Sequence, residues 1–197
     1  MCLLWIKLCV MYIVIPKGKH YDPSLARAYY RFLPFCYKRN KVITFNAKIL
    51  TEPYDIRPDP DQLDQHKLCG INLSFWKESN VNAIMTSFQA NPKDGTWDIY
   101  PYVNVNRNFV PGVRLFQSKP GDSIRSEFKL INRNTIHLSI YHNDEPVISN
   151  PYSYSWSNAK ARYPALILPY HGGKDNDGNG IGGVAPVDIH IELDIKK

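Results

Sequence analysis

The clearest pattern in the chain is a strict alternation of apolar and polar residues over residues 135–142. Every second residue there is apolar, and the set is Ile136, Leu138 and Ile140. This period of two is typical of a strand with one buried face. A polar break at residues 143–146 follows, and apolar residues resume at Val147. Two apolar runs joined by a tight break rich in Asn, Asp and Pro predict a β-hairpin.

The same extended pattern recurs along the rest of the chain. It predicts strands at residues 11–15, 41–50, 66–76, 82–90, 96–105, 122–131, 163–170 and 187–195. In the third of these, Leu68 is expected to share a face with Gly70, opposite Cys69 and Ile71. Pro101 cannot donate to a strand ladder, so its strand is predicted at a sheet edge or with a bulge.

Helical signals are few, and the best is a single turn starting at Pro23-Ser24. Roughly ten short strands without helical crossovers predict one antiparallel sandwich. The chain has 197 residues, and its 15 prolines and 11 glycines fall mainly between apolar runs, as many tight turns require. We therefore predict an all-β chain whose residues 11–197 form a single β-sandwich domain.

Residues 1–10 form a hydrophobic extension with three interpretations. It is a weak signal peptide, although a basic first region and a small-residue cleavage site are missing. Alternatively, the start is mis-assigned and translation begins at Met11, or the segment is an unusual first strand or hydrophobic arm. The apolar run is too short for an integral membrane span.

The formal charge of +6 is spread thinly, and its densest clusters are the short runs at residues 17–20 and 38–41. A nucleic-acid-binding protein usually concentrates its positive charge on one surface, so no sequence-specific nucleic-acid partner is expected. The charge still suits an anionic partner such as an acidic polysaccharide. The four cysteines form no CxxC pair and predict no zinc site, which fits a reduced compartment or burial as small hydrophobes.

Residues 123–149 resemble the lectin and glucanase type of jelly roll, the concanavalin-A-like sandwiches. The similarity lies in a strand ending Leu-Ser-Ile-Tyr, a polar turn, and then Glu-Pro-Val. Those proteins often have Asn-Gly in the turn, whereas this chain has Asn143-Asp144. The resemblance implies a jelly-roll β-sandwich.

Three stretches resemble small proteins of tailed phages and gut bacteria that carry no assigned activity. They are residues 15–21, residues 66–70, and residues 169–173 leading to residues 185–189. This resemblance implies a shared sandwich and a viral origin. It also implies a role on the virion or cell surface, or in the cytoplasm of a bacterial host.

Two aromatic stripes are the candidate ligand-binding residues. Alternation places Tyr100 and Tyr102 on one face of their strand, and it does the same for Tyr152, Tyr154 and Trp156. Sugars stack their apolar faces on such rings, although aromatic rows also pack inside sandwiches. The main hypothesis is therefore a non-enzymatic module that binds carbohydrate or serves a virion or cell surface.

The alternative is a polysaccharide lyase acting on acidic glycans. Residues 125–128, Arg-Ser-Glu-Phe, are similar to a strand of the jelly-roll lyases, without its final arginine. The resemblance implies Arg125 to neutralise the uronate, with His137 and Tyr141 as base and acid. The usual Gln-x-His strand is missing, so these three are weak catalytic candidates. A third hypothesis is a purely structural component of a homo-oligomer or virion.

Two further patterns carry candidate chemistry. Residues 188–194 alternate acidic or histidine side chains with isoleucine or leucine, and resemble the start of a laminarinase strand, but Lys196 stands where a second glutamate is needed. A polar outer face explains them more simply. Asp175, Asp177 and Asn179 offer oxygens as in the first half of a calcium loop, but Pro186 occupies the twelfth position. Calcium is the one candidate cofactor.

Overall fold

The computed structural model describes residues 10–25, 41–55, 65–73, 82–105, 108–110, 112–132, 135–147, 152–155, 165–172 and 183–196. The strands are β1 Met11–Ile15, β2 Val42–Ile49, β3 His66–Asn72, β4 Asn82–Asn91, β5 Thr96–Val105, β6 Asn108–Val110, β7 Phe116–Ser118, β8 Ile124–Asn132, β9 Thr135–His142, β10 Glu145–Pro146, β11 Tyr152–Ser155, β12 Ala165–Ile167 and β13 Ile189–Lys196. A short 3-10 helix spans Pro23–Leu25, and the rest of the predicted helical turn, up to residue 29, lies outside the described residues. No helix within these residues is long and apolar enough to cross a membrane.

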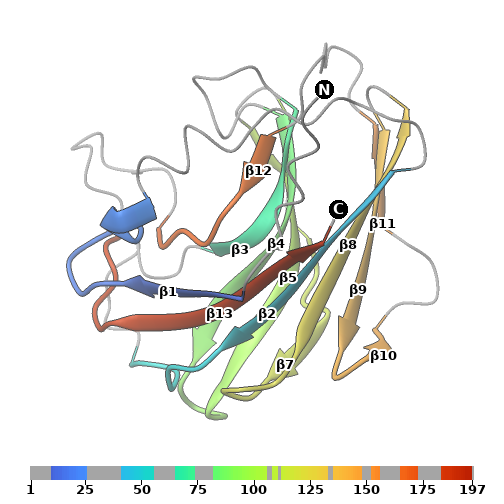
Figure 1. Ribbon diagram of the computed structural model, residues 1–197. Coiled ribbons are helices and arrows are strands. Elements are labelled where there is room, and N and C mark those ends of the chain that lie inside the picture. The colour runs from blue at the N-terminus through green and yellow to red at the C-terminus, as the bar shows by residue number, and fades with distance from the viewer. Residues whose placement is uncertain are drawn as a thin grey trace.

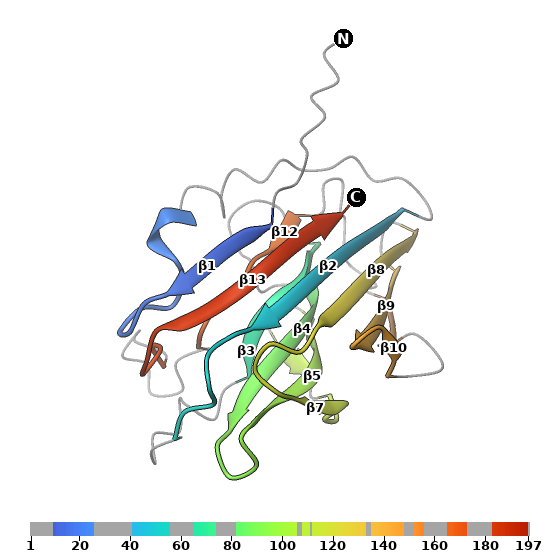
Figure 2. The ribbon, with the colours of Figure 1, turned by 60° about the horizontal axis from the view of Figure 1, so that its bottom comes forward.

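The strands form two antiparallel sheets that face each other (Figures 1 and 2). Sheet A has the order β1-β13-β2-β8-β9-β10, with β11 also paired to β9. Sheet B has the order β12-β3-β4-β5-β6, with β7 also paired to β5. The predicted all-β antiparallel sandwich is therefore confirmed.

The core lies between the sheets and is built from alternate strand residues. Ile136, Leu138 and Ile140 of β9 are each at most 1% exposed, as the opening alternation predicts. On the core side of sheet B, the rings of Phe88 on β4 and Trp97 on β5 pack edge to face with centroids 5.3 Å apart. Burying rings of this size is a large part of what stabilises a sandwich of two sheets.

The β9–β10 hairpin adopts the expected tight turn without a glycine. Asn143 and Asp144 both have positive φ, 50° and 69°. A two-residue turn with positive φ at both positions is type I′, whose twist matches that of the flanking strands. Asn and Asp enter this region at lower cost than most residues, which explains how the turn forms here.

The predicted faces of β3 need one correction. The ladder between β3 and β4 shifts register between Lys67 and Cys69. A bulge of this kind adds one residue to a strand and resets its alternation. Consequently Leu68 lies in the core with Cys69 and Ile71, whereas the sequence placed it on the opposite face.

The prediction for Pro101 was also wrong. Strand β5 is an interior strand without a bulge at this residue, because it pairs continuously with β4. On its other side, however, β7 pairs with residues up to Ile99 and β6 pairs from Val103 onward. Pro101 therefore lies where the neighbouring ladder is interrupted, so its missing N–H costs no ladder bond there.

Strand β13 lies between β1 and β2, inside sheet A. Its Ile189, Ile191 and Leu193 are fully buried, as the alternation predicts. The polar residues between them contact neighbouring strands on the outer face. Lys48 pairs with Glu192 at 3.4 Å, and Tyr12 hydrogen-bonds His190 at 2.9 Å. These contacts agree with a polar outer face.

Candidate functional site: the outer face of sheet B

The outer face of sheet B carries an unusual set of polar and aromatic residues. The pairing of β3, β4 and β5 places the following residues on this face: Lys67, Asn72, Met85, Ser87, Gln89, Asp98, Tyr100, Tyr102 and Asn104. Tyr100 lies opposite Ser87, and Tyr102 lies opposite Met85. Several of these side chains are buried although they point away from the core. Buried polar groups require partners, so the contacts of this face define the site.

Lys67 is the most unusual member of the face because it is only 3% exposed. Its ammonium donates a hydrogen bond to the carbonyl of Gly172 at 2.8 Å. The same Nζ lies 4.8 Å from the ring centroid of Tyr102 and 5.9 Å from that of Tyr170. Two aromatic rings and a carbonyl oxygen thus stabilise this buried positive charge.

The backbone fixes where Lys67 lies. Its N–H donates to the carbonyl of Tyr170, and the N–H of Tyr170 donates to the carbonyl of Lys67, both at 2.8 Å. This bridge ties β3 to the segment that follows β12. It places Tyr170 and Gly172 beside the first residues of β3, where they contact the Lys67 side chain.

Tyr102 connects this buried charge to the surface. Its ring stacks on Phe109 of β6, with centroids 4.5 Å apart and planes 26° from parallel. Phe109 is 42% exposed, so the stack reaches solvent. A large apolar ring at the surface is a natural contact for a ligand with an apolar face.

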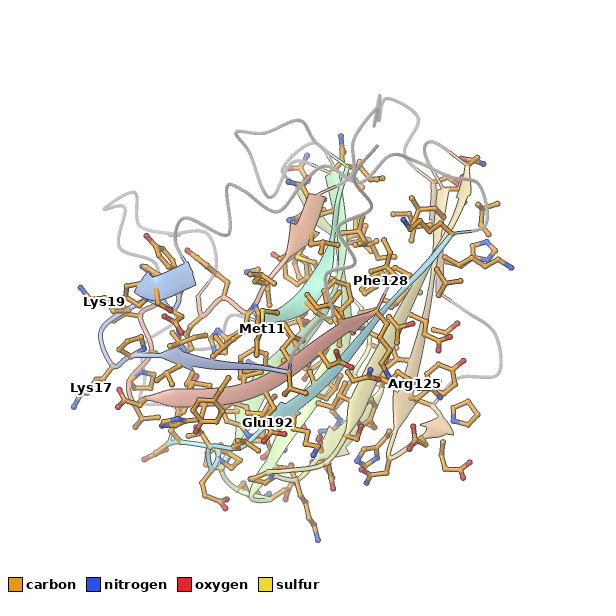
Figure 3. The ribbon with its side chains drawn as sticks, in the orientation of Figure 1. Met11, Lys17, Lys19, Arg125, Phe128 and Glu192 are labelled. Carbon is orange, nitrogen blue, oxygen red and sulfur yellow. The ribbon has the colours of Figure 1, made fainter. Side chains whose placement is uncertain are left out.

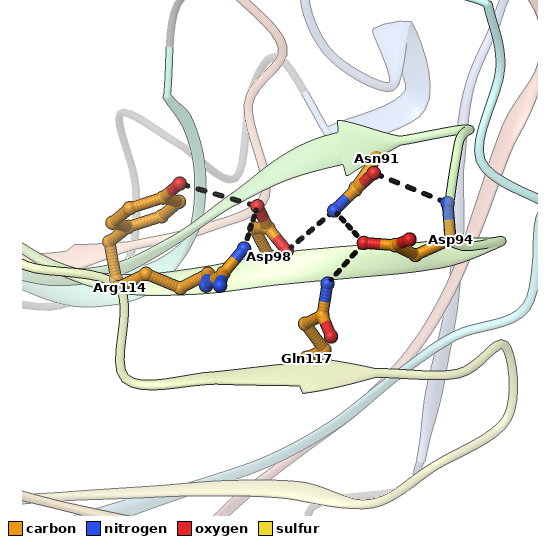
Figure 4. Close-up of polar contacts among 6 residues, drawn as sticks. Asn91, Asp94, Asp98, Arg114 and Gln117 are labelled. Carbon is orange, nitrogen blue, oxygen red and sulfur yellow. Dashed lines mark hydrogen bonds and ion pairs between the residues drawn. The ribbon is translucent and has the colours of Figure 1, made fainter.

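A carboxylate network occupies the other end of the same face (Figure 4). Asp98 accepts hydrogen bonds from Arg114 at 3.1 Å, Asn91 at 3.3 Å and the Tyr100 hydroxyl at 3.5 Å. Burial and the nearby Asp98 carboxylate raise the pKa of Tyr100. Tyr100 therefore remains protonated at neutral pH and acts as a hydrogen-bond donor.

The neighbouring turn extends this network. Asp94 accepts hydrogen bonds from Gln117 at 2.9 Å and from Asn91 at 3.0 Å. These two bonds lower the pKa of Asp94. Arg114 keeps half of its side-chain surface exposed, and Asp98 engages one guanidinium nitrogen, Nη1. A guanidinium has five N–H donors, so Arg114 retains donors that point to solvent.

The predicted aromatic stripes fall on different sheets. Tyr100 and Tyr102 lie on the outer face of sheet B, where they contact Asp98 and Phe109. Tyr152 and Tyr154 belong to β11, which pairs with β9 in sheet A. Trp156 lies outside the described residues. The structure thus does not bring the two stripes together.

The three catalytic candidates lie on the outer face of sheet A, and only two of them meet. The Arg125 guanidinium lies 3.7 Å from the ring centroid of Tyr141. Both side chains bond to Glu127, at 2.9 Å and 3.2 Å. Figure 3 shows Arg125 on the β8–β9 side of the sheet, far from Lys17 and Lys19 beside β1.

His137 is separated from this pair. It lies four residues before Tyr141 on the same strand, which is about 13 Å at the usual strand rise. Burial, followed by the Glu127 carboxylate, raises the pKa of Tyr141. Glu127 pairs with Arg125, and only 28% of the Arg125 side chain is exposed, compared with 50% for Arg114, so the Arg125 guanidinium is less accessible to a uronate. These contacts suit a structural ion pair on a solvated face.

The predicted calcium ligands Asp175, Asp177 and Asn179 lie outside the described residues, so calcium stays a prediction. Within the part of the chain that the structure describes, no group of three or more His, Cys, Asp or Glu residues is placed to hold a metal. Cys69 is a free thiol buried in the core, and burial raises its pKa to about 12. It behaves as a small hydrophobe, as expected.

Sequence reasoning missed Lys67, Phe109 and Arg114 as site residues. Arg114 and Phe109 lie in irregular or very short segments, where periodicity carries little information. Lys67 had a usable signal, because residues 66–70 and 169–173 were both singled out for their resemblance to other proteins. The structure brings these two stretches into contact through the backbone bonds between Lys67 and Tyr170.

Comparisons with solved structures agree with this fold. The chain is similar to an alginate lyase, Aly36B, solved with an alginate trisaccharide, with a TM-score of 0.50 and 11% identity over 94% of this chain and 80% of that one. It is also similar to an endo-β-1,4-glucuronan lyase from the fungus Trichoderma reesei, with a TM-score of 0.48 and 12% identity over 95% and 80% of the chains.

A scytalido-glutamic peptidase solved with a transition-state analogue is similar at a TM-score of 0.47 and 12% identity, over 92% and 74% of the chains. No protein-family model matches the sequence, and no curated protein matches it. At these identities the likeness concerns the fold alone. The protein is a jelly-roll β-sandwich, related in architecture to the concanavalin-A-like sandwiches.

Proposed function

We propose that this protein binds an acidic polysaccharide on the outer face of sheet B. The observation that carries the proposal is the stack of Tyr102 on exposed Phe109, with the Lys67 ammonium 4.8 Å from the Tyr102 ring. An exposed ring can stack on a sugar, and a buried cation behind it attracts a carboxylate electrostatically without touching it. Both occur here within one patch of three strands.

The net charge of the chain favours an anionic sugar over a neutral one. On this face, the described charges of Lys67 and Arg114 are offset by those of Asp98 and Asp94. The chain as a whole carries +6. A polyanion is therefore attracted over long range, and the exposed guanidinium of Arg114 matches a carboxylate at short range.

The fold supports the same class of ligand. The structures it resembles include an alginate lyase with bound alginate trisaccharide and a lyase of glucuronan. Both substrates are chains of uronic acids. A jelly roll of this size is thus a known scaffold for holding acidic polysaccharides, and the residues of sheet B supply suitable contacts in this chain.

Eliminative cleavage of the bound chain is the second candidate function. It needs a cation to neutralise the uronate and a group to take the C5 proton. Lys67 beside Tyr102 favours it, since a cation and a tyrosine lie in one place. Burial raises the pKa values of Tyr100 and Tyr170, which suits them as proton donors and not as bases. Binding without cleavage is therefore the main proposal.

A calorimetric titration with alginate and polyglucuronate oligosaccharides tests the proposal, with a neutral glucan of equal length for comparison. Phe109→Ala should weaken binding about tenfold, the usual scale for loss of one stacked ring. Tyr12→Ala is the matched control, because Tyr12 is an exposed ring on sheet A. Failure of the wild type to bind either uronate chain, or equal weakening by both variants, contradicts the proposal.

The same samples separate binding from cleavage. Lyase activity produces unsaturated uronate ends that absorb in the ultraviolet, whereas binding alone leaves the absorbance unchanged. A rising absorbance that Tyr102→Phe abolishes would establish the second candidate. A purely structural role in an oligomer or virion stays a prediction, which light scattering of the purified protein tests. Calcium likewise predicts a melting temperature that rises with Ca²⁺ and falls with EDTA.

A further inference from the structure

Behind Lys67 lies a buried network of two histidines and a tyrosine. The rings of His66 and His171 stack with centroids 3.7 Å apart and planes 20° from parallel. The Tyr54 hydroxyl lies 3.0 Å from Nε2 of His66 and 2.6 Å from Nε2 of His171. Both imidazoles are fully buried, and Tyr54 is nearly so. One hydroxyl therefore joins two rings that water does not reach.

Backbone partners determine where the protons of this network are. The N–H of Gly172 donates to Nδ1 of His66 at 3.0 Å, so Nδ1 of His66 carries no proton. His66 must then be protonated at Nε2, which donates to the Tyr54 oxygen. Nδ1 of His171 lies 2.7 Å from the carbonyl of Gly183, so it carries the proton and Nε2 accepts from Tyr54. With both imidazoles neutral, every polar atom of the network is paired.

The network holds Gly172, whose carbonyl positions the Lys67 ammonium. Gly172 donates its N–H to His66 and accepts the Lys67 ammonium at its carbonyl. Its φ of +99° suits glycine, and a side chain there would come within 2.7 Å of the Gly183 carbonyl. The adjacent His171 N–H donates to the carbonyl of His20. Segments from four parts of the chain thus converge on the residue that faces Lys67.

We propose that Tyr54, His66 and His171 are positioning residues for the Lys67 ammonium, and that they hold it only while both imidazoles are neutral. The inference rests on the proposed function, and it assigns that site an acid-sensitive control. Acidification would release Gly172 and, with it, the alignment of the buried cation for an acidic polysaccharide.

The surroundings oppose a positive charge on either ring. Among the described residues, the titratable groups that face the pair are Tyr54, Lys67 and His20, and none is a carboxylate. A proton on Nδ1 of His66 would also point at the N–H of Gly172, so two donors would face each other. Burial lowers the pKa of both histidines, that of His171 to about 4. Protonation therefore disrupts the network.

The first test needs no ligand. Imidazole ¹⁵N NMR of the unliganded protein at neutral pH should show His66 protonated at Nε2 and His171 protonated at Nδ1. The opposite tautomer at either residue, or a charged ring, overturns the network as we assign it. This measurement stands whether or not the protein binds a glycan, so its failure is distinct from failure of the proposed function.

The second test measures the affinity for an alginate oligosaccharide from neutral pH down to about pH 4, the pKa of His171. Wild-type affinity should fall about tenfold or more across this range, whereas the uronate carboxylates of the ligand stay largely ionised. His171→Asn keeps a donor for Gly183 and cannot titrate in this range, so its affinity should depend less on pH. An identical pH profile in the wild type and this variant contradicts the proposal.

Tyr54→Phe provides a third outcome. It removes the shared hydroxyl and should weaken binding at neutral pH about tenfold, whereas Tyr12→Phe on sheet A should not. Circular dichroism at the assay temperature shows whether each variant is folded. A folded Tyr54→Phe protein with wild-type affinity and pH profile would reduce the network to a purely structural role and overturn the positioning proposal.

Discussion

The two outer faces of the sandwich both carry polar residues, but the surroundings of these residues differ. On sheet A, opposite charges lie side by side in partly exposed pairs, such as Lys48 with Glu192 and Arg125 with Glu127. Each charge has a neighbour of opposite sign and access to water. Pairs of this kind contribute little to stability and keep a sheet face soluble.

On sheet B, polar side chains are buried on the side that points away from the core. Lys67, Ser87 and Asn104 are each less than 5% exposed. At Lys67, the segment after β12 provides the cover, because Tyr170 bonds the Lys67 backbone and the Gly172 carbonyl accepts from its ammonium. Lys67 lies there beside two aromatic rings and a carbonyl oxygen. The outer face of sheet B thus makes specific buried contacts, whereas the polar residues cited on sheet A remain partly exposed to solvent.

This contrast shows that charge count alone does not identify a functional face. Among the described residues, sheet A has several ion pairs, in which opposite charges neutralise each other. The described charges of sheet B include a buried cation beside the rings of Tyr102 and Tyr170. Burying a charge is costly even when it has partners, so its presence calls for a structural or functional reason.

The largest expected effect concerns pH and the buried histidines. The pKa of His171 falls from 6.5 to about 4 in the folded protein, so the unfolded chain binds the proton first. The stabilisation from neutral His171 is therefore fully present above about pH 6.5 and is reduced by about 3 kcal/mol as the pH falls towards 4. His66, whose pKa burial also lowers, adds to the decline. Urea unfolding measured at several pH values should show this slope.

His171→Asn should reduce this slope to the part that His66 contributes, whereas His190→Asn on sheet A should leave it unchanged. The acidic residues act in a different range, since the pKa values of Asp94 and Asp122 are lowered from 3.8 and affect only the lowest pH. A wild-type stability that is constant between pH 6.5 and 4 would contradict the assigned burial of neutral histidines.

A smaller effect is expected from replacing one lysine on each face with methionine. Lys67→Met leaves the Gly172 carbonyl without its donor and should cost about 1–2 kcal/mol of the free energy of unfolding. Lys48→Met removes an exposed pair with Glu192 and should cost less than about 0.5 kcal/mol. Chemical denaturation of both variants gives the comparison, and equal costs would remove the distinction between the faces.

The Asp98 network should show an intermediate cost near 1 kcal/mol. Asp98→Asn keeps the shape of the side chain but loses the charge that binds Arg114. Glu192→Gln is the matched change on sheet A and should cost a few tenths of a kcal/mol. Thermal unfolding at two salt concentrations checks this, because screening should affect the exposed pair more.

The smallest effect is a gain in stability at the β9–β10 turn. Asp144 has φ of 69°, and glycine adopts that region without a steric penalty. Asp144→Gly should therefore stabilise the protein by about 0.5 kcal/mol, reduced by the loss of its long 3.8 Å contact with Arg125. A drop in melting temperature would show that this contact outweighs the backbone strain.

The sandwich and most strand faces follow from the sequence, because alternation is a local property. Spacing alone predicts a shared buried face for Ile136, Leu138 and Ile140, and all three are buried in the structure. The faces of β3 were harder, since a bulge at Lys67 and Cys69 shifts Leu68 into the core. Whether a bulge forms depends on how two strands align, and the sequence of neither strand alone determines that alignment.

The candidate site depended on the tertiary structure to a greater degree. Alternation within each strand was enough to identify the antiparallel sandwich and the shared face of Tyr100 and Tyr102, because period-two patterning is a local property, and the resemblance of residues 123–149 added the jelly roll. Only the folded chain could place Lys67, Tyr102 and Phe109 together or join Tyr54 to two histidines. These contacts cross large sequence separations, such as 105 residues between Lys67 and Gly172, and strand pairing rather than local pattern decides them.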